Sequence, residues 1–207
     1  TPVMSSAPSH QTPRLSRRII FFALATSLLH ILIAVSHGGP VAVPDIPSYL
    51  QFAYVMDEGA RTSPSVYHPG YGILLSPLTL IGISGLGLHQ GALVVNAMLA
   101  GLCVCLAASF ASRLGASARL SAVCSVAAAL YPALSTASRI AWPETLICVS
   151  VLGSAILAHD QTSPKNFFLG FLSGLLFCIH PRAIVLTAAL VVLAAMTPSK
   201  RLRIPLV

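Results

Sequence analysis

Long apolar stretches, separated by short breaks that contain polar, Gly or Pro residues, recur along the chain. A transmembrane helix needs about 20 apolar residues to cross a hydrocarbon core of about 30 Å. The last two stretches are short for that thickness, and we expect them to form a hairpin in a thinned or protein-lined region. The pattern predicts an all-α, polytopic transmembrane helix bundle with about six spans, at 19–36, 90–114, 120–137, 143–159, 167–179 and 183–196.

The first stretch is followed by a long loop, 37–88, that is not uniformly polar. A short helix lying in the membrane interface is predicted here, because five apolar residues fall on one helical face: Ile46, Tyr49, Leu50, Ala53 and Met56. Further along, residues 72–86 are apolar but contain Pro77 and glycines. Whether 72–86 cross the membrane decides the orientation of every later span.

The basic residues decide between the two topologies. If 72–86 do not cross, nine Lys and Arg residues are cytoplasmic and three are outside, whereas a crossing gives five inside and seven outside. Cytoplasmic loops carry the excess of Lys and Arg, so the first topology is favoured and 72–86 is interpreted as a re-entrant or interfacial helix on the outer side. The predicted cytoplasmic residues are Arg14, Arg17, Arg18, Arg113, Arg119, Lys165, Lys200, Arg201 and Arg203, and the outer ones are Arg61, Arg139 and Arg182.

The same topology divides the chain into three parts. Residues 1–18 are expected to be a flexible cytoplasmic tail, 19–200 the transmembrane bundle with 37–88 as its first outer loop, and 201–207 a cytoplasmic end. The chain begins at Thr1 without an initiator methionine and stops just after a basic cluster. We therefore expect it to be the amino-terminal portion of a longer protein.

Composition agrees with a membrane protein. Hydrophobic residues make up 56% of the 207 residues and charged residues 8%, against about 25% charged residues in a soluble domain. The net charge of +7 does not indicate nucleic-acid binding, because the basic residues flank the apolar stretches. All five cysteines lie inside apolar stretches, so we expect them to be buried, small apolar residues without a disulfide framework.

Most of the ionisable residues outside the predicted cytoplasmic loops gather at the outer side of the membrane. Four of the five acidic residues of the chain are among them. Charged groups near membrane depth are costly and usually pair with each other or with a ligand, so this gathering predicts a site. The predicted outer cluster is Asp45, Asp57, Glu58, Arg61, His68, Arg139, Glu144, His180 and Arg182.

Two of these residues have a structural and a functional interpretation. Asp45, in Pro44-Asp45-Ile46-Pro47, is either a helix N-cap or a general base at the membrane surface. His68, in His68-Pro69-Gly70, either belongs to a turn that starts an apolar helix or binds a ligand.

Three segments, in this order, resemble the GT-C superfamily of membrane glycosyltransferases, which includes protein O-mannosyltransferases, aminoarabinose transferases of lipid A and actinobacterial mannosyl- and arabinosyltransferases. An Asp (Asp45) follows the first span, with Tyr49 and Ala53 after it and then His68-Pro69-Gly70-Tyr71 before Leu74-Leu75. Segments 138–146, with Pro143-Glu144, and 170–183, with Gly170-x-x-x-Gly174 and Pro181-Arg182, are similar to later family motifs. The resemblance covers about residues 19–200. The chain departs from the family pattern in two motifs, because it lacks a second acid after Asp45 and has His-Pro-Gly where His-Pro-Pro is commoner. It also has fewer membrane helices than most members and no soluble carboxy-terminal domain.

The resemblance implies that a sugar is transferred, with inversion, from a polyprenyl-phosphate donor to an acceptor outside the cytoplasm. The acceptor would be a glycan, a lipid or a protein, and the enzyme would lie in the plasma membrane as part of the cell envelope. Asp45 would be the catalytic base and Arg182 would bind the leaving phosphate, with Arg139 as a weaker candidate. His68, Glu144 and His180 would bind substrate, although Glu144 also suits a helix start and His180 a turn. Some relatives use a divalent metal, but this chain has a single Asp at the position of Asp45, so no metal or other cofactor is expected. The expected partners are the lipid-linked donor, the acceptor and membrane lipids.

Two alternatives to an active transferase stay open. A transporter or lipid flippase would have ionisable residues near the middle of the membrane and broken helices related by an internal repeat. A noncatalytic relative of the transferases would keep the same fold signals.

Overall fold

The fold is described by a computed structural model for residues 16–36, 45–54, 68–160 and 163–196. Within these ranges the chain forms helices and no strand. The elements are α1 (Arg17–Ser36), α2 (Ile46–Gln51), η1 (Phe52–Tyr54), α4 (Gly70–Leu80), α5 (Gly85–Arg113), α6 (Ala118–Ala129), α7 (Pro132–Ala137), α8 (Glu144–Asp160), α9 (Ser163–Ile179), η2 (Pro181–Ala183) and α10 (Ile184–Met196).

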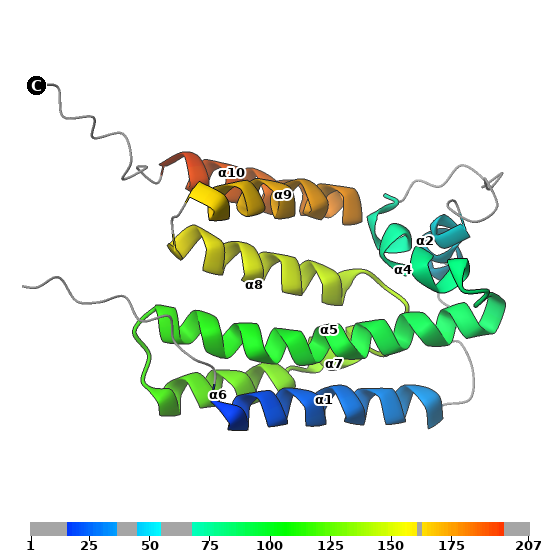
Figure 1. The fold of residues 1–207 in the computed structure, drawn as a ribbon, viewed down its shortest axis with the longest axis horizontal. Helices are drawn as coiled ribbons and strands as arrows, with labels where there is room; N and C mark the ends of the chain where they lie inside the picture. The colour runs from blue at the N-terminus through cyan, green and yellow to red at the C-terminus, as the bar shows by residue number, and fades with distance from the viewer. Residues whose placement is uncertain (1–15, 37–44, 55–67, 161–162, 197–207) are drawn as a thin grey trace, which may run out of the picture.

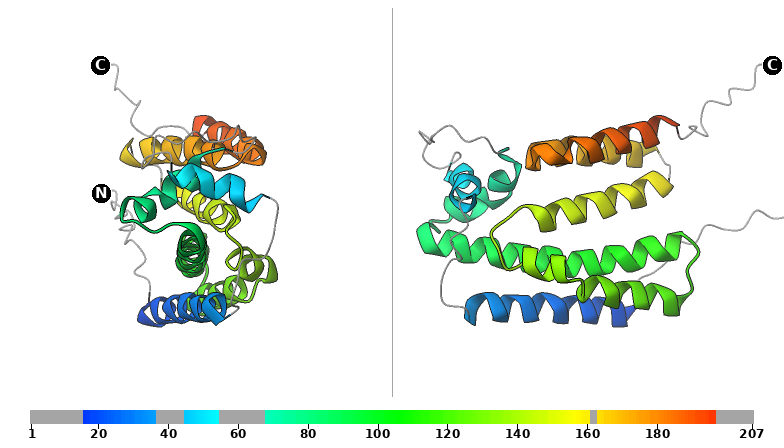
Figure 2. Two further views of the ribbon diagram at one scale, coloured as in Figure 1. Left: turned by 90° about the vertical axis from the view of Figure 1, so that its right-hand side faces the viewer. Right: turned by 180° about the vertical axis from the view of Figure 1, so that it is seen from behind.

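The long helices lie roughly alongside one another and run back and forth along the long axis of the molecule (Figure 1). Helix α5 packs on α1, α6 and α8, α8 packs on α9, and α9 packs on α10, so the helices are stacked from α1 to α10 (Figure 2). The short helices α2, η1 and α4 gather at the end where α5 and α8 begin and α9 finishes. We call this end the loop end, and the end where α1 begins and α5 finishes the basic end.

The apolar stretches give the positions of most helices. Helices α1, α5, α8, α9 and α10 each match a predicted span to within a few residues at one or both ends, and α1 and α5 are long and apolar enough to cross a membrane. The predicted single helix over 120–137 is wrong. The chain leaves the helix at Leu130 and Tyr131, and Pro132 begins the separate helix α7. Tyr131 is extended (φ −67°, ψ 116°), as expected for a residue before proline.

Residues 72–86 do not form one helix through the bundle. Helix α4 has 11 residues, which gives a length of about 16 Å, well below the hydrocarbon thickness. The chain then turns at Gly82 (φ +83°) and Gly85 (φ +55°), where an L side chain would be strained. Since α4 packs on α2, η1, α5 and α9, it stays at the loop end.

The helix predicted in the first loop is present, but its apolar face is not turned to a membrane surface. Ile46, Tyr49 and Ala53 are buried in the same core as Tyr71 and Leu75 of α4. The hydroxyl of Thr79 also donates a hydrogen bond to the Ala53 carbonyl oxygen (2.8 Å). Met56 lies outside the described residues. Protein packing therefore explains the pattern that we assigned to the membrane interface.

The interior of the bundle contains many small and polar residues, whereas the outside carries large apolar ones. On α1 the large side chains point outward, with Phe21 74% exposed and Leu24 64% exposed. The buried polar residues, by contrast, come from most of the helices: Thr26, His30, Ser76, Thr79, His89, Asn96, Ser121, Ser125, Ser138, Thr145, Ser150, Ser154, Ser173 and His180. A soluble domain rarely exposes so many large apolar side chains along one helix.

The expectation that all five cysteines are buried is wrong, and one small-residue motif makes no close contact. Cys148 and Cys178 are exposed, although all five cysteines are free as expected. Gly170 and Gly174 are exposed, and no atom lies within 4 Å of a Cβ built at either position, so this Gly-x-x-x-Gly pair is not a helix contact among the described residues. The close crossing is at Gly101 of α5 instead, where a Cβ would lie 2.7 Å from the Ala23 carbonyl oxygen of α1.

The two kinds of glycine give a matched test of this packing. We expect Gly101→Ala to lower the apparent unfolding temperature in detergent, because the added methyl group forces α1 away from α5, and such overpacking costs about 1–3 kcal/mol. Gly170→Ala is the control, since the same change in an open position should be neutral or stabilising by up to about 1 kcal/mol. Equal effects of the two substitutions would contradict the α1–α5 contact.

Candidate functional site

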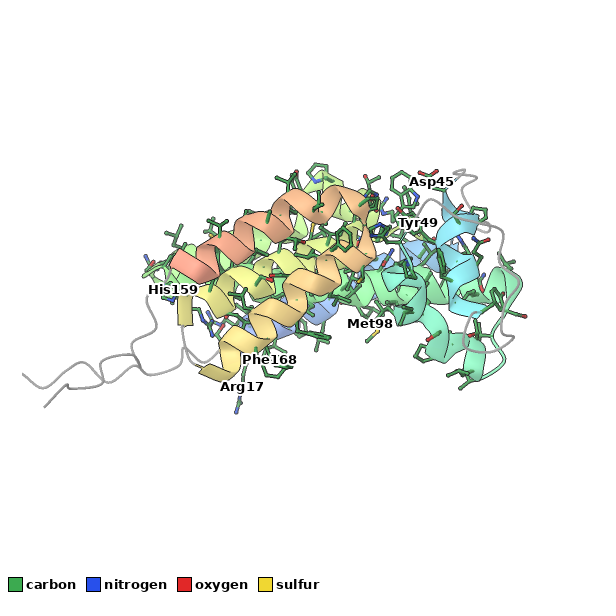
Figure 3. The ribbon with its side chains drawn as sticks, turned by 90° about the horizontal axis from the view of Figure 1, so that it is seen from above. Arg17, Asp45, Tyr49, Met98, His159 and Phe168 are labelled. Carbon is green, nitrogen blue, oxygen red and sulfur yellow. The ribbon has the colours of Figure 1, made fainter. Side chains whose placement is uncertain are left out.

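The candidate site lies at the loop end and is built from four parts of the chain. These are the start of α2 with Asp45, the start of α4 with His68, the start of α8 with Glu144, and the end of α9 with His180. Figure 3 shows Asp45 and Tyr49 together at this end, with Arg17 and His159 at the other. The structure thus brings elements that are distant in sequence to one end of the bundle.

Asp45 occupies the N-cap position of α2, directly before Ile46. Its side chain makes no capping hydrogen bond, and its backbone oxygen accepts from the Tyr49 amide (3.3 Å). Asp45 is half-buried. The structural interpretation of Asp45 is therefore confirmed for its position but not for the hydrogen bond that makes an N-cap stabilising.

His68 attaches the start of α4 to the end of α9. Its Nδ1 donates a hydrogen bond to the Phe177 carbonyl oxygen, and its ring meets the Phe177 ring edge-on at a centroid distance of 4.9 Å. The turn predicted at His68-Pro69-Gly70 is present, since Pro69 is the N-cap of α4. One nitrogen of His68 is consequently used for a structural contact, whatever the other nitrogen binds.

Two glycines let α4 approach its neighbours closely. A Cβ at Gly70 would lie 2.6 Å from the Cys178 carbonyl oxygen, and a Cβ at Gly72 would lie 2.8 Å from the Tyr49 carbonyl oxygen. Both obstacles are backbone atoms, which cannot rotate away as a side chain can. Helix α4 is therefore wedged between α2 on one side and the end of α9 on the other.

Aromatic rings fill the space between these elements. Tyr49 meets Tyr71 edge-on with ring centroids 6.1 Å apart, and it lies 6.4 Å from the His180 ring. Tyr49, Tyr71 and His180 are all buried. His180 is also part of the predicted turn, because its backbone oxygen accepts from the Ala183 amide (2.9 Å).

Asn96 joins this cluster to the segment before α8. It is fully buried, accepts a hydrogen bond from the Tyr71 hydroxyl (3.1 Å), and donates to the carbonyl oxygens of Ile140 (2.7 Å) and Trp142 (3.0 Å). The segment that it holds leads directly into Glu144. Asn96 thus fixes α4 and the start of α8 relative to α5.

Glu144 is the first residue of α8, as predicted for an acid at the positive end of a helix dipole. It is half-buried and lies close enough to Tyr71 to affect its ionisation. Burial raises the pKa of the Tyr71 phenol above its ordinary value, the hydrogen bond with Asn96 acts in the opposite direction, and the negative charge of Glu144 adds to the rise. Tyr71 therefore stays a neutral hydrogen-bond donor.

The remaining predicted residues are less closely joined to this cluster. Arg139 is exposed and donates to the Ser135 hydroxyl (3.0 Å). Its neighbour Ser138 lies on the α1 side, with Oγ 2.5 Å from His30 Nδ1. Arg182 is placed by its backbone in η2, two residues after His180, and its side chain lies outside the described part of the structure, as do Asp57, Glu58 and Arg61.

Sequence reasoning missed Asn96 and Tyr71 as organising residues. The available signal for Asn96 was its amide side chain well inside the long apolar stretch 85–113, because membrane helices rarely carry such a group without a partner. Its partners lie 44 and 46 residues further along the chain, so sequence spacing does not reveal them.

The cluster offers a carboxylate at the start of α2, an acid at the start of α8, phenol and imidazole side chains, and an arginine position in η2. Such a set suits proton transfer and phosphate binding. Among the described residues no three His, Cys, Asp or Glu side chains lie together in a way that could hold a metal ion.

No protein-family model, curated protein or solved structure matches the chain. The resemblance to glycosyltransferases thus stays a prediction that rests on the three sequence segments.

The role of Asn96 can be tested through stability. We expect Asn96→Ala to lower the free energy of unfolding by about 2 kcal/mol or more, because it leaves two backbone carbonyl groups without their donor in a buried place. Tyr71→Phe removes one hydrogen bond and should cost about 1 kcal/mol. Unfolding in mixed micelles with increasing sodium dodecyl sulfate measures both, and an Asn96→Ala effect no larger than that of Tyr71→Phe would show that Asn96 does not hold the segment.

Proposed function

We propose that this chain is a bundle of about six membrane spans that transfers a sugar from a polyprenyl-phosphate donor to an acceptor outside the cytoplasm. The observation that carries the proposal is the gathering of Asp45, His68, Glu144, His180 and the η2 backbone of Arg182 at the end of the bundle opposite Arg17, Arg18, Arg113 and Arg119. The positive-inside rule assigns the basic end to the cytoplasm and the loop end to the outside.

The exposed apolar surface supports a membrane location. Seven large apolar side chains of α1 are at least 44% exposed: Ile20, Phe21, Leu24, Leu28, Leu29, Leu32 and Val35. Full burial of such a side chain contributes about 1.5–3 kcal/mol, so leaving these half exposed to water forgoes about 5–10 kcal/mol on one helix. That is comparable with the whole stability of a soluble domain, about 5–15 kcal/mol.

The proposed reaction assigns one role to each side of the cluster. Asp45 accepts the proton of the acceptor hydroxyl while the hydroxyl oxygen attacks the anomeric carbon. The new glycosidic bond forms as the bond from the anomeric carbon to the phosphate oxygen breaks, and the polyprenyl phosphate leaves with the electron pair. Arg182 binds the leaving phosphate and stabilises its growing charge, with Arg139 as a second candidate. The rings of Tyr49, four residues after Asp45, and His180, two residues before Arg182, lie 6.4 Å apart and connect the two parts of the chain.

One feature favours a transporter as the second candidate. His30 is buried in the second half of α1 beside Ser138, and the predicted span 120–137 is broken at Pro132. An ionisable group within a span and a broken helix are both common in transporters. The transferase is preferred because the acids of the described chain, apart from Asp160, lie at the loop end.

The catalytic assignment predicts the effect of Asp45→Asn in the full-length protein. We expect donor turnover to fall by about 10²–10⁴-fold, because an amide cannot take up the acceptor proton. The fold should be kept, since Asn ranks with Asp at an N-cap. Turnover is measured in proteoliposomes with a polyprenyl-phosphate sugar.

The matched control for this test is Asp160→Asn, the same change in the last residue of α8 at the basic end. It should leave turnover unchanged. A wild-type rate in Asp45→Asn would reduce Asp45 to a helix-start residue and would favour the transporter.

A further inference from the structure

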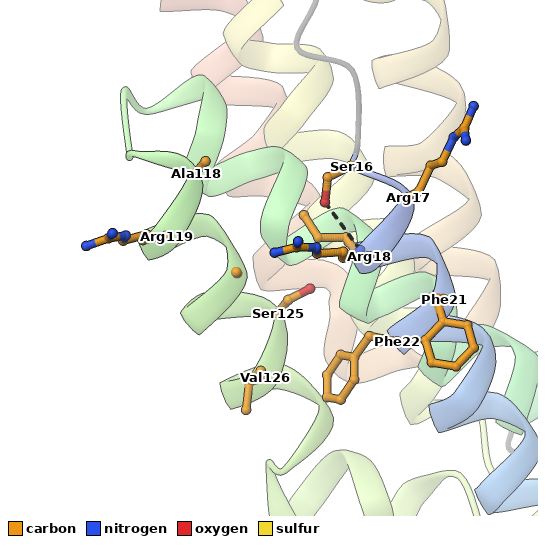
Figure 4. Close-up of a pocket in the computed structure, with 11 residues that line it drawn as sticks. Ser16, Arg17, Arg18, Phe21, Phe22, Ala118, Arg119, Ser125 and Val126 are labelled. Carbon is orange, nitrogen blue, oxygen red and sulfur yellow. Dashed lines mark hydrogen bonds between the residues drawn. The ribbon is translucent and has the colours of Figure 1, made fainter.

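The basic end of the bundle carries a groove that has no part in the proposed reaction. It has a volume of about 800 Å³ and lies between the start of α1 and α6 (Figure 4). Helix α1 packs mainly on α5 and only lightly on α6, which leaves the groove open. Ligand pockets typically measure about 300–1,000 Å³, so this groove is large enough for a chain-like ligand.

The groove has apolar walls and a basic rim. Phe22 on α1 and Ala122 and Val126 on α6 line its length. Arg18 points into the gap toward α6, whereas Arg17 and Arg119 stand at the two edges of the groove with their side chains directed outward (Figure 4). Its length and chemistry match a molecule with a negative head and an apolar tail.

None of the acidic residues whose side chains the structure describes lies beside the three arginines. The described acidic residues with placed side chains, Asp45 and Glu144, are at the loop end, and all three arginines are exposed. Arg113, at the same end, differs because its guanidinium donates to the Ser109 hydroxyl and to the Ser109 carbonyl oxygen (3.3 Å). The groove therefore combines exposed guanidinium groups with an apolar floor.

We propose that this groove binds an anionic glycerophospholipid of the surrounding leaflet, with the lipid phosphate at Arg18 and Arg119 and one acyl chain along Phe22 and Val126. Guanidinium groups bind phosphate oxygens through paired hydrogen bonds, and basic pockets between membrane helices select anionic headgroups. A phospholipid is favoured over the lipid-linked sugar donor because the groove is at the end opposite the candidate site. The inference rests on the membrane location of the bundle and not on sugar transfer.

The test uses native mass spectrometry of the full chain in detergent, with phosphatidylglycerol and phosphatidylcholine of identical acyl chains as probes. Phosphatidylglycerol should be retained in preference to phosphatidylcholine. Each basic residue near a lipid headgroup contributes about a fivefold gain in affinity, so R18Q/R119Q should weaken phosphatidylglycerol binding by about 20-fold. The control R113Q removes a charge at the same end but outside the groove and should change binding less than about twofold.

A second variant separates the groove from a general attraction of charge. Ala122→Trp keeps every arginine and fills the groove from an exposed position, so the fold should survive while phosphatidylglycerol binding falls about tenfold, as expected when the acyl chain is displaced. Equal retention of the two lipids, or wild-type binding by R18Q/R119Q or Ala122→Trp, would overturn the proposal. Preferential binding of undecaprenyl phosphate over phosphatidylglycerol would also overturn it, since the occupant would then be a prenyl lipid. Loss of sugar transfer in Asp45→Asn has no bearing on these outcomes.

Discussion

The close packing of α4 between α2 and the end of α9 is the constraint on which the candidate site depends. Gly70 and Gly72 bring the α4 backbone against the carbonyl groups of Cys178 and Tyr49, a distance that any side chain would prevent. This contact keeps α4 at the loop end and sets Tyr71 beside Tyr49 and Asn96. Through Asn96 it also fixes the segment that leads into Glu144. A looser α4 would separate the three parts of the chain that carry Asp45, Glu144 and His180.

Hydrogen bonds between helices add to the apolar core of this bundle. Hydroxyl groups donate to backbone oxygens of neighbouring helices, from Ser125 to Val104 (3.0 Å) and from Thr187 to Ser173 (3.0 Å). In a membrane, apolar surface gains little by meeting other apolar surface, so small residues and such hydrogen bonds hold the helices together. The exposed Leu, Ile and Phe side chains on the outside of the bundle are consistent with lipid as the surrounding medium.

The sequence was sufficient for the positions of most helices, and it placed Asp45 and Glu144 at the same end of the bundle, where the structure has them. Apolar runs are local features, and the glycines that end α4 act through their own backbone conformation. The break at Pro132 was missed because the flanking residues are apolar and an average over the run hides one proline. The contacts of Asn96 and Gly70 join residues far apart in the chain, so they follow from the tertiary packing and not from any local pattern. The Gly170-x-x-x-Gly174 pair makes no close contact, since a small-residue pair specifies such a contact only where a partner helix is present.

The membrane topology decides whether the residues of the outer cluster face the same side, because they do so only if α4 stays on one side of the membrane. Cysteine accessibility tests it directly, with a membrane-impermeant maleimide applied to intact cells that express single-cysteine variants. We expect Ser63→Cys, before α4, and Ser84→Cys, between α4 and α5, both to react from outside, whereas Ser117→Cys, at the start of α6, should react only after permeabilisation. Reaction of Ser117→Cys from the same side as Ser63→Cys, with Ser84→Cys protected, would show that α4 crosses the membrane and would divide the proposed site between its two faces.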